Sequence, residues 1–374
     1  MYRIGINGTI LGFGRSDGFA RVTYETIVHL LQHSPDMTIY STMTEFVHCP
    51  NTTKVPAILA RSNFAGNMAK LLWHQTALPY LIKKKKIDIY YSPIPDGMLW
   101  PVCPQITTIY DLSPLIYPES SPRYKHYYRF IIPRLLKCSH LTIAGSHSTK
   151  RDLESLFPDV GRIEVIYPGY SREIFMPQVK PKIEAAKNKY GLKSYILCVS
   201  EIRPYKNIRK LIEAFVALPK TDVTLAIVGR VTKLEKDIAQ FVKENKQSNN
   251  IRLLGYVPDD DLASLYAGAY AFIHPSLYEG FGLPPLEAMA SGCPVLVSNV
   301  SSLPEICGDA GLYFNPRDVN SISGAIINIL NNKAFRLNLI VKGLERSKQF
   351  SFEKTADRLM EVFEDLHAQP SKKR

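Results

Sequence analysis

Short apolar runs alternate with segments of helical period along the whole chain, and this alternation restricts the fold more than any other feature of the sequence. Within each run the apolar residues are continuous, which is typical of strands that are buried on both faces. Such strands need helices on both sides of their sheet, so the pattern predicts an α/β protein with parallel sheets. The expected strands are 2–7, 87–93, 105–111, 141–146, 163–169, 195–200, 223–229, 251–257, 270–276 and 294–299.

These strands fall into two series, which are separated by a proline-rich segment. Three prolines and Gly169 interrupt any regular pattern between residues 168 and 182, so we expect a hinge there. The length of 374 residues suits two domains of roughly 150 to 200 residues each. The sequence therefore predicts two Rossmann-like domains with parallel sheets that face each other across a cleft. Their expected ranges are 1–170 and 171–350, followed by an amphipathic helix and tail at 351–374 that can pack back on the first domain.

Composition is that of an ordinary soluble globular protein, because 45% of the residues are hydrophobic and 21% are charged. No run approaches the roughly 18 apolar residues of a membrane span, and the start MYRIGIN turns polar too early for a signal peptide. The six cysteines include no C-x-x-C pair, so buried thiols are favoured over disulfides or zinc ligands. We therefore expect a cytoplasmic protein, which can work at the inner face of the membrane.

The segment HPSLYEGFGLPPLEAMASG has the order strand, glycine loop and helix, with the helix expected to begin near Pro284. At the carboxyl end of a parallel strand, Gly280 and Gly282 let the backbone come close to a ligand. The loop amides and the helix N-terminus then supply hydrogen-bond donors and partial positive charge, which together make a phosphate cradle. The alternative is a turn in which glycine serves the backbone conformation alone.

Two glutamates in this segment stand eight residues apart, and both can line one pocket. The run E-G-F-G-L-P-P-L-E resembles the E-x7-E signature of family 4 of the retaining glycosyltransferases, which have the GT-B fold. The resemblance implies that Glu279 contacts the transferred sugar and that Glu287, expected in the first turn of the helix, binds ribose hydroxyls. It also implies that the amides around Phe281, Gly282 and Leu283 hold sugar or phosphate.

A basic loop follows the strand at 195–200, with Arg203 and Lys206 before a helix that is expected to begin near Ile208. It resembles the family's diphosphate-binding loop. Two cations placed there stabilise the charge that develops on a departing diphosphate. The family often has arginine directly before the lysine, whereas this chain has Tyr205 there, so Lys206 matches the pattern and Arg203 departs from it. Solvated loop charges are the alternative reading.

Other donor-side positions follow from the same resemblance. Tyr256 and Val257 correspond to the family's main-chain contacts with the nucleobase, and Gly229 ends the preceding strand. The glycine-rich loop around Gly14 resembles the family's first loop over the donor phosphates. Three aspartates at 259–261 favour a helix cap and first turn over a metal site.

In the first half, QITTIYDLSP resembles a family segment that usually reads His-Asp, and Tyr110 and Asp111 occupy these positions. Tyr110 can donate a hydrogen bond and Asp111 can contact the acceptor as a catalytic residue, or both belong to an ordinary turn at a strand end. Ser146 and His147 match the family's serine-rich entry to a helix on the acceptor side, although helix capping by Ser146 or Ser148 is the simpler explanation.

The formal net charge of +12 predicts attraction to an anionic partner. The lysines at 83–86 and the aromatic and basic stretch at 123–137 are the clearest concentrations of positive charge. The second stretch suits an interfacial helix at an anionic membrane, or a helix whose aromatic residues pack on a sheet while its charges stay solvated.

The resemblance implies a retaining hexosyltransferase that uses a nucleotide sugar as substrate, with no tightly bound cofactor and no metal. The loop RPYKN and the run YDLSPLIYPE are similar to bacterial mannosyltransferases of polysaccharide assembly. GDP-mannose is therefore the favoured donor, with a UDP-sugar of glucose, galactose or GlcNAc as the alternative. The expected acceptor is a glycan or a lipid-linked molecule.

Two other classes of function remain open. A UDP-sugar 2-epimerase also pairs two Rossmann-like domains around a nucleotide sugar. A non-catalytic module that binds nucleic acid or membrane can keep an old fold. The presence of Lys206, Glu279 and Glu287 argues against such a module, and nucleic acid is not an expected partner.

Overall fold

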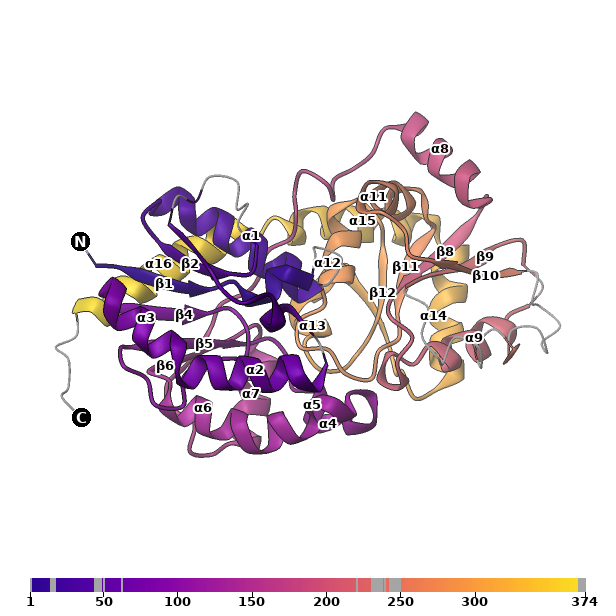
Figure 1. The fold of residues 1–374 in the computed structure, drawn as a ribbon. Helices are drawn as coiled ribbons and strands as arrows, with labels where there is room; N and C mark the ends of the chain where they lie inside the picture. Colours follow the sequence, from indigo (N-terminus) through magenta and orange to yellow (C-terminus); the bar gives the residue numbers. More distant parts are fainter. Residues whose placement is uncertain are drawn as a thin grey trace. The chain divides into compact units, whose positions relative to one another are not determined.

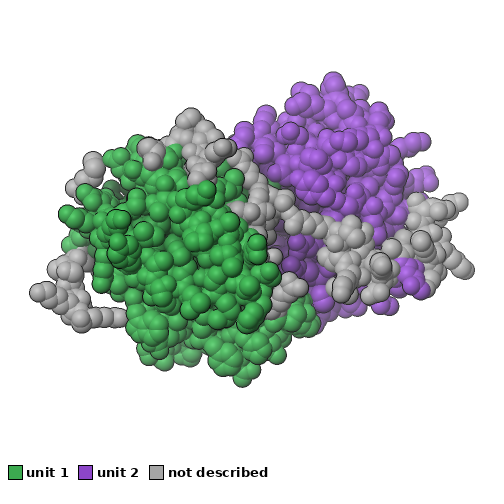
Figure 2. Space-filling view, in the orientation of Figure 1, with its two compact units in different colours: residues 1–169, 350–374 green, residues 170–349 purple. Residues whose placement is uncertain are grey.

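A computed structural model describes residues 2–13, 18–43, 49, 51–61, 63–219, 221–229, 238, 240, 241 and 250–368. The chain divides into two compact units, coloured separately in Figure 2. Unit 1 comprises residues 1–169 and 350–374, and unit 2 comprises residues 170–349.

Unit 1 is built on a seven-stranded sheet whose order is β3-β2-β1-β4-β5-β6-β7 (Figure 1). Every neighbouring pair is parallel, and the central strand β1 pairs with both β2 and β4. The order reverses between β1 and β4, which is the switch point of a doubly wound sheet. The strands are β1 (Ile4–Asn7), β2 (Thr38–Ser41), β3 (Thr52–Lys54), β4 (Ile89–Ser92), β5 (Gln105–Ile109), β6 (Leu141–Ala144) and β7 (Ile163–Val165).

The strands predicted for this half are β1, β4, β5, β6 and β7, whereas β2 and β3 were missed. Both missed strands are short, and β3 consists of the polar residues TTK at the edge of the sheet. The residues of β3 are only partly buried or exposed, so this strand lacks the continuous apolar run from which the other strands were predicted.

Helices cover both faces of this sheet. A π-turn at Tyr127–Ile131 separates α5 from α6 and precedes Pro133. Since proline has no N–H, the carbonyl of Arg129 cannot receive the usual helical hydrogen bond from that position. The helices are α1 (Gly18–His33), α2 (Phe64–Gln75), α3 (Ala77–Lys85), α4 (Ser113–Ile116), α5 (Pro122–His126), α6 (Ile132–Cys138), α7 (His147–Leu156) and α16 (Phe352–Ala368).

The last helix, α16, belongs to unit 1, where Figure 1 shows it beside α1. Its buried Leu359 and Phe363 share a core cluster with Ile27 of α1. The backbone N–H of Lys354 donates to the Ser351 hydroxyl over 3.2 Å, which confirms Ser351 as a helix cap. The amphipathic helix therefore supplies part of the hydrophobic core of the first unit.

Unit 2 contains a six-stranded parallel sheet of order β10-β9-β8-β11-β12-β13. Its order reverses between β8 and β11, which places a second switch point there. All five strands predicted for this half are present, and the short edge strand β13 was missed. The strands are β8 (Tyr195–Val199), β9 (Thr224–Val228), β10 (Ile251–Gly255), β11 (Ala271–His274), β12 (Val295–Ser298) and β13 (Gly311–Phe314).

The helices of unit 2 bury apolar faces against this sheet in one large core cluster. In α11 the aspartates at 259–261 form the first turn, as predicted, and the N-cap is Pro258. Asp261 pairs with Lys189 over 2.6 Å. The helices are α8 (Lys180–Tyr190), α9 (Ile208–Val216), α11 (Asp259–Gly268), α12 (Leu283–Ala290), α13 (Leu303–Cys307), α14 (Val319–Asn331) and α15 (Lys333–Ser347).

Two doubly wound parallel sheets confirm the predicted α/β class. All six cysteines are free thiols, and burial raises the pKa of Cys198 to about 12. Within the described part of the chain, no helix is both long enough and apolar enough to cross a membrane.

Candidate active site

The site in unit 2 lies at the carboxyl ends of β8 and β11, which are hydrogen-bonded neighbours at the switch point. The loop after β8 carries Lys206, and the loop after β11 carries Glu279. Because parallel strands end at the same edge of their sheet, the two loops meet although they are 73 residues apart in sequence.

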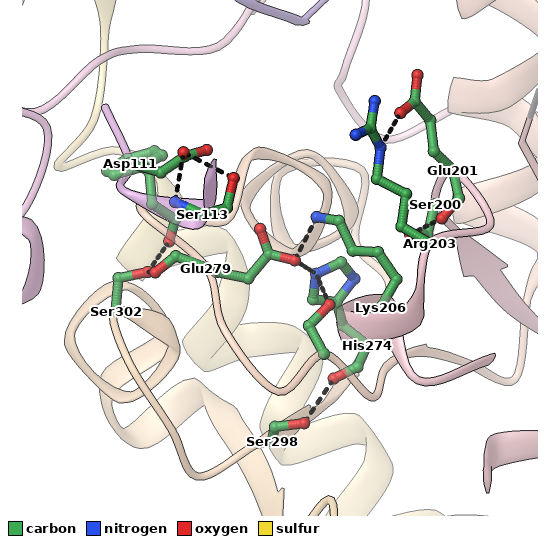
Figure 3. Close-up of polar contacts among 12 residues, drawn as sticks. Asp111, Ser113, Ser200, Glu201, Arg203, Lys206, His274, Glu279, Ser298 and Ser302 are labelled. Carbon is green, nitrogen blue, oxygen red and sulfur yellow. Dashed lines mark hydrogen bonds and ion pairs between the residues drawn. The ribbon is translucent and has the colours of Figure 1, made fainter. Parts of the chain in front are cut away.

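Lys206 and Glu279 form an ion pair, with 2.6 Å between Nζ and Oε1 (Figure 3). Their side chains are 16% and 11% exposed, so the pair is largely shielded from water. Burial by itself raises the pKa of Glu279, but the Lys206 charge and the hydrogen bonds from His274 and Lys206 more than offset burial. The pKa of this carboxyl therefore lies below its ordinary value, and Glu279 is a carboxylate at neutral pH.

His274 is the last residue of β11 and was not among the predicted site residues. Its Nε2 lies 2.7 Å from Oε1 of Glu279 and 3.1 Å from Oγ of Ser276. The Ser298 hydroxyl donates to the His274 carbonyl over 3.2 Å. A histidine that closes an otherwise apolar strand directly before a site loop was the available signal, because a buried ring nitrogen needs a polar partner.

Two further side chains that sequence reasoning missed hold the site loops. The Ser302 hydroxyl contacts the carbonyl oxygens of Glu279 at 3.0 Å and Phe281 at 2.7 Å. Asn207 donates to the carbonyls of Pro275 and Pro316 over 3.1 and 2.7 Å. These bonds fix the loop backbones, and nothing in the local sequence indicates partners so far away along the chain.

Gly282 caps α12 with φ of 109°, a left-handed conformation that favours glycine. The helix has fewer N-terminal donors than the sequence analysis assumed, because Pro284 and Pro285 have no N–H. The N–H of Leu286 donates to the Gly282 carbonyl over 3.3 Å. Among the first four residues of the helix, the N–H of Leu283 is therefore the one that is neither absent nor bonded to the Gly282 carbonyl. Most of the donors of a phosphate cradle must then come from the loop amides.

Glu287 is buried, at 3% exposure, and it lies within α12. The expectation that it occupies the first turn was wrong, because the helix begins at Leu283 and Glu287 is its fifth residue. The helix starts one residue earlier than predicted.

Arg203 and Lys206 bind different carboxylates. The Arg203 Nε lies 2.7 Å from Oε2 of Glu201, and both side chains are about one-third or more exposed, at 36% and 43%. The structure thus brings Lys206 to the shielded pair with Glu279 and places Arg203 in a more hydrated pair (Figure 3).

The remaining donor-side positions have mixed environments. A Cβ added to Gly229 would lie 1.9 Å from the Ser200 carbonyl oxygen, so only glycine fits there. Tyr256 is 59% exposed and Val257 is 2% exposed, so the tyrosine ring faces solvent while the valine is part of the core. Gly14 lies outside the described residues.

The predicted acceptor-side residues lie at strand ends of unit 1. Burial, with Tyr91 nearby, raises the pKa of Tyr110 well above its ordinary value. Asp111 Oδ1 accepts from the N–H and hydroxyl of Ser113 over 3.0 and 2.9 Å, which is the local turn considered as an alternative. Ser146 accepts from the Thr149 N–H over 3.0 Å, which confirms helix capping, and His147 is exposed beside Tyr167.

The switch point of unit 1 holds a neutral network that sequence reasoning missed. Asn7 Nδ2 donates to the Ser92 hydroxyl over 3.0 Å and lies 3.4 Å from His74 Nε2. His74 Nδ1 lies 2.7 Å from the Lys70 carbonyl. Burial lowers the pKa of His74, so the ring is neutral and its Nδ1 carries the proton.

Among the described residues, no group of three or more histidine, cysteine, aspartate or glutamate side chains could hold a metal ion. The expectation that the reaction needs no metal stays a prediction.

Comparisons with known proteins identify the family. Residues 179–346 match the family model of the glycosyl transferases group 1, and residues 16–173 match that of glycosyltransferase family 4. Over 326 residues the chain is 35% identical to the O-antigen chain mannosyltransferase B of Escherichia coli, with 84% of each chain covered. Over 284 residues it is 31% identical to the O-antigen chain mannosyltransferase RfbU of Salmonella typhimurium, with 74% of this chain and 75% of that protein covered.

Solved structures give the fold class. The sucrose-phosphate synthase from Thermosynechococcus elongatus matches with a TM-score of 0.81 and 20% identity, covering 98% of this chain and 100% of that one. Anabaena Alr3699/HepE in complex with UDP-glucose matches with a TM-score of 0.73 and 17% identity, with 98% and 100% covered. The two parallel-sheet units have the GT-B fold of glycosyltransferases. The chain belongs to glycosyltransferase family 4, with a group 1 glycosyltransferase region in its second half.

Proposed function

We propose that this glycosyltransferase transfers mannose from GDP-mannose to a glycan or lipid-linked acceptor in the assembly of a bacterial polysaccharide or lipopolysaccharide. The names of the O-antigen mannosyltransferases, at 31 to 35% identity, support the sugar and the acceptor class. The shielded ion pair of Lys206 and Glu279 at the β8 and β11 switch point is the observation that carries the site assignment.

In this proposal each site residue has a defined task. Lys206 neutralises charge that develops on the departing diphosphate, and such stabilisation by a fixed charge is worth about 3 to 4 kcal/mol in comparable sites. Glu279 accepts from a hydroxyl of the transferred sugar, and Glu287 binds the ribose. The amides from Gly280 to Leu283 hold sugar or phosphate, and the backbone at Tyr256 and Val257 lies against the base.

The remaining predicted site residues make supporting contacts with the donor or the acceptor. Arg203 adds positive charge beside the diphosphate, and Gly14 and Gly229 allow close approach of the backbone. Tyr110 and Asp111 face the acceptor, with Ser146 and His147 on the same side. These assignments follow the family resemblance, and Tyr110, Asp111 and Gly229 also lie directly after parallel strands.

The proposed reaction retains the anomeric configuration. The acceptor hydroxyl attacks from the face that the diphosphate leaves, and a departing phosphate oxygen takes the hydroxyl proton. Neither a metal nor a tightly bound cofactor takes part. The protein supplies orientation, exclusion of water and a fixed positive charge for the leaving group.

The deciding experiment offers the enzyme GDP-mannose and the UDP-sugars of glucose, galactose and GlcNAc, each with and without a lipid-linked glycan extract. NMR of the product then identifies the sugar and its anomer. We expect mannose to be transferred to the acceptor with retention of the anomeric configuration, from GDP-mannose and from none of the UDP-sugars. Transfer from a UDP-sugar would replace the proposed donor, and conversion of a UDP-sugar without acceptor would indicate a 2-epimerase.

We also propose that the protein contacts an anionic membrane through a basic hollow in unit 1. The hollow is lined by apolar residues, Asp159 and four cations, and none of the four cations forms an ion pair among the described residues. Phe130, which is 65% exposed, and Trp100, which is 63% exposed beneath the Arg134 guanidinium, add amphipathic anchors nearby. The cations are Lys125, Arg129, Arg134 and Lys137.

Sedimentation with phosphatidylglycerol and phosphatidylcholine vesicles tests this contact. The double variant R129E/R134E should bind phosphatidylglycerol vesicles about tenfold or more weakly. The control K83E/K84E makes the same change of charge on α3, a helix that contributes no residue to the hollow. Equal loss in both variants would show that net charge, and not this hollow, attracts the membrane.

A further inference from the structure

His274 ends a central strand of the unit 2 sheet and has no task among those proposed above for the reaction. Its side chain is 1% exposed, and its ring stacks on Phe272 with centroids 5.7 Å apart. β11 lies between β8 and β12, and the backbone of His274 itself pairs with Val297 of β12. The imidazole therefore has a fixed position beneath the loop that contains Glu279.

The surroundings of the two ring nitrogens assign the proton. Nε2 faces Oε1 of Glu279 at 2.7 Å, and this carboxylate can only accept a hydrogen bond. Nδ1 is buried, and it has no hydrogen-bond partner among the described residues. A proton on Nδ1 would leave a buried N–H unsatisfied and would turn the Nε2 lone pair toward a negative charge. The neutral tautomer with the proton on Nε2 avoids both costs.

The two donors to Glu279 converge on one of its oxygens. Lys206 Nζ lies 2.6 Å and His274 Nε2 lies 2.7 Å from Oε1 (Figure 3). No described residue donates to Oε2. Two hydrogen bonds to one oxygen fix the rotation of the carboxylate, so Oε2 keeps its capacity to accept a hydrogen bond from a ligand.

We infer that His274 is a positioning residue: its Nε2–H holds Oε1 of Glu279 so that Oε2 accepts a hydroxyl of the donor sugar. This inference rests on the proposed function of the site. Lys206 has three N–H donors, so it can serve Oε1 and the diphosphate at the same time. Without His274, the carboxylate would rest on this lysine alone, and its direction would depend on where Lys206 points.

The buried Nδ1 lone pair argues against a purely structural role. A site that needs only a ring to stack on Phe272 is filled better by phenylalanine, which buries no unsatisfied nitrogen. Histidine at this position has that disadvantage and gains one hydrogen bond to the Glu279 carboxylate. The function of the residue therefore lies on its Nε2 side.

Three variants separate the ring from its donor. His274→Phe keeps the ring and removes the Nε2–H, and it should lower kcat/KM for GDP-mannose by about 10- to 100-fold, as expected for a hydrogen bond to a charged group. His274→Gln places an amide N–H near the position of Nε2 and should recover most of this loss. Affinity for GDP, which carries no sugar, should stay the same in both. His274→Met, which is close to glutamine in length and has no donor, should behave like His274→Phe.

A double-mutant cycle with Glu279→Ala tests whether His274 acts through Glu279. If it does, His274→Phe should cause no further loss of kcat/KM once the carboxylate is absent. Additive losses, or a parallel loss of GDP affinity, would overturn the inference and leave the glycosyltransferase assignment intact.

NMR of protein labelled with nitrogen-15 at histidine supplies a readout that needs no turnover. The expected spectrum has a protonated Nε2 and an unprotonated Nδ1 for His274, and a proton on Nδ1 would overturn the inference. UDP-glucose with UDP serves as a second pair of probes in every binding and kinetic measurement. If the wild type transfers sugar from neither donor, the proposed function fails and the role of His274 falls with it.

Discussion

The two switch points carry different polar groups at the carboxyl ends of their strands. In unit 1, Asn7 at the end of β1 donates one neutral hydrogen bond to Ser92 at the end of β4, beside a neutral His74. In unit 2, the ends of β8 and β11 carry the charged pair of Lys206 and Glu279. The same edge of a doubly wound sheet is thus a neutral polar network in one unit and an ion pair in the other.

This difference indicates which switch point can bind a charged ligand. A neutral network whose donors and acceptors are used internally stabilises the sheet and offers little to a diphosphate. A shielded ion pair with an available carboxylate oxygen can exchange protein contacts for ligand contacts, and its lysine can respond to charge that develops on a leaving group. Substitutions at the two switch points should therefore separate stability from catalysis.

Lys206→Ala should have the largest effect, a loss of about 100- to 1000-fold in kcat/KM, because it removes the fixed charge at the leaving group. The protein should stay folded at the assay temperature, since Glu279 can take up a proton. Steady-state kinetics with the nucleotide sugar measures the loss. Lys210→Ala, on the surface of α9, is the matched control and should keep wild-type kinetics. Undiminished turnover of the Lys206 variant would refute the proposed site.

Asn7→Ala should give the opposite pattern at the other switch point. It removes the bonds to Ser92 and to the N–H and hydroxyl of Thr9, and leaves buried partners unsatisfied. The free energy of unfolding should fall by about 2 to 3 kcal/mol in denaturant titrations, while the Michaelis constant for the nucleotide sugar stays the same. The more exposed Asn51→Ala should change stability by less than about 0.5 kcal/mol. A large kinetic defect in Asn7→Ala would show that the neutral network also serves the reaction.

His74 should make the stability of unit 1 depend on pH. Burial lowers its pKa from 6.5, so the unfolded state binds a proton at a higher pH than the folded state does. Its contribution is complete above pH 6.5 and is lost as the pH falls below that value, by up to about 1.4 kcal/mol per pH unit. Urea titrations from pH 7.5 to about 5 should show a flatter dependence for His74→Phe than for the wild type. Equal slopes would assign the dependence to other groups.

Arg203→Ala should have the smallest effect, a loss of about two- to fivefold in kcat/KM, because partly exposed ion pairs contribute at most about 1 kcal/mol. The guanidinium binds Glu201 and is 36% exposed, unlike the shielded Lys206. A loss as large as that of Lys206→Ala would mean that Arg203 turns to the diphosphate when the donor binds.

Much of the fold could be predicted because strands and helix caps depend on residues that are close together in the sequence. Continuous apolar runs identified ten of the strands and their parallel arrangement, since burial on both faces leaves its mark on each strand separately. The edge strands β3 and β13 carry a weaker mark, and they were missed together with β2. Helix caps such as Ser146 and Ser351 were also predictable, because a cap bonds an N–H only three residues away.

The sequence by itself determined the two parallel sheets, the glycine loop and the family, because these depend on neighbouring residues or on a contiguous motif. Only the tertiary structure decided that Lys206, from the loop after β8, meets Glu279, from the loop after β11. The physical reason is strand order: β8 and β11 are neighbours in space but are separated by two strands in sequence, and no local pattern states which loops share an edge.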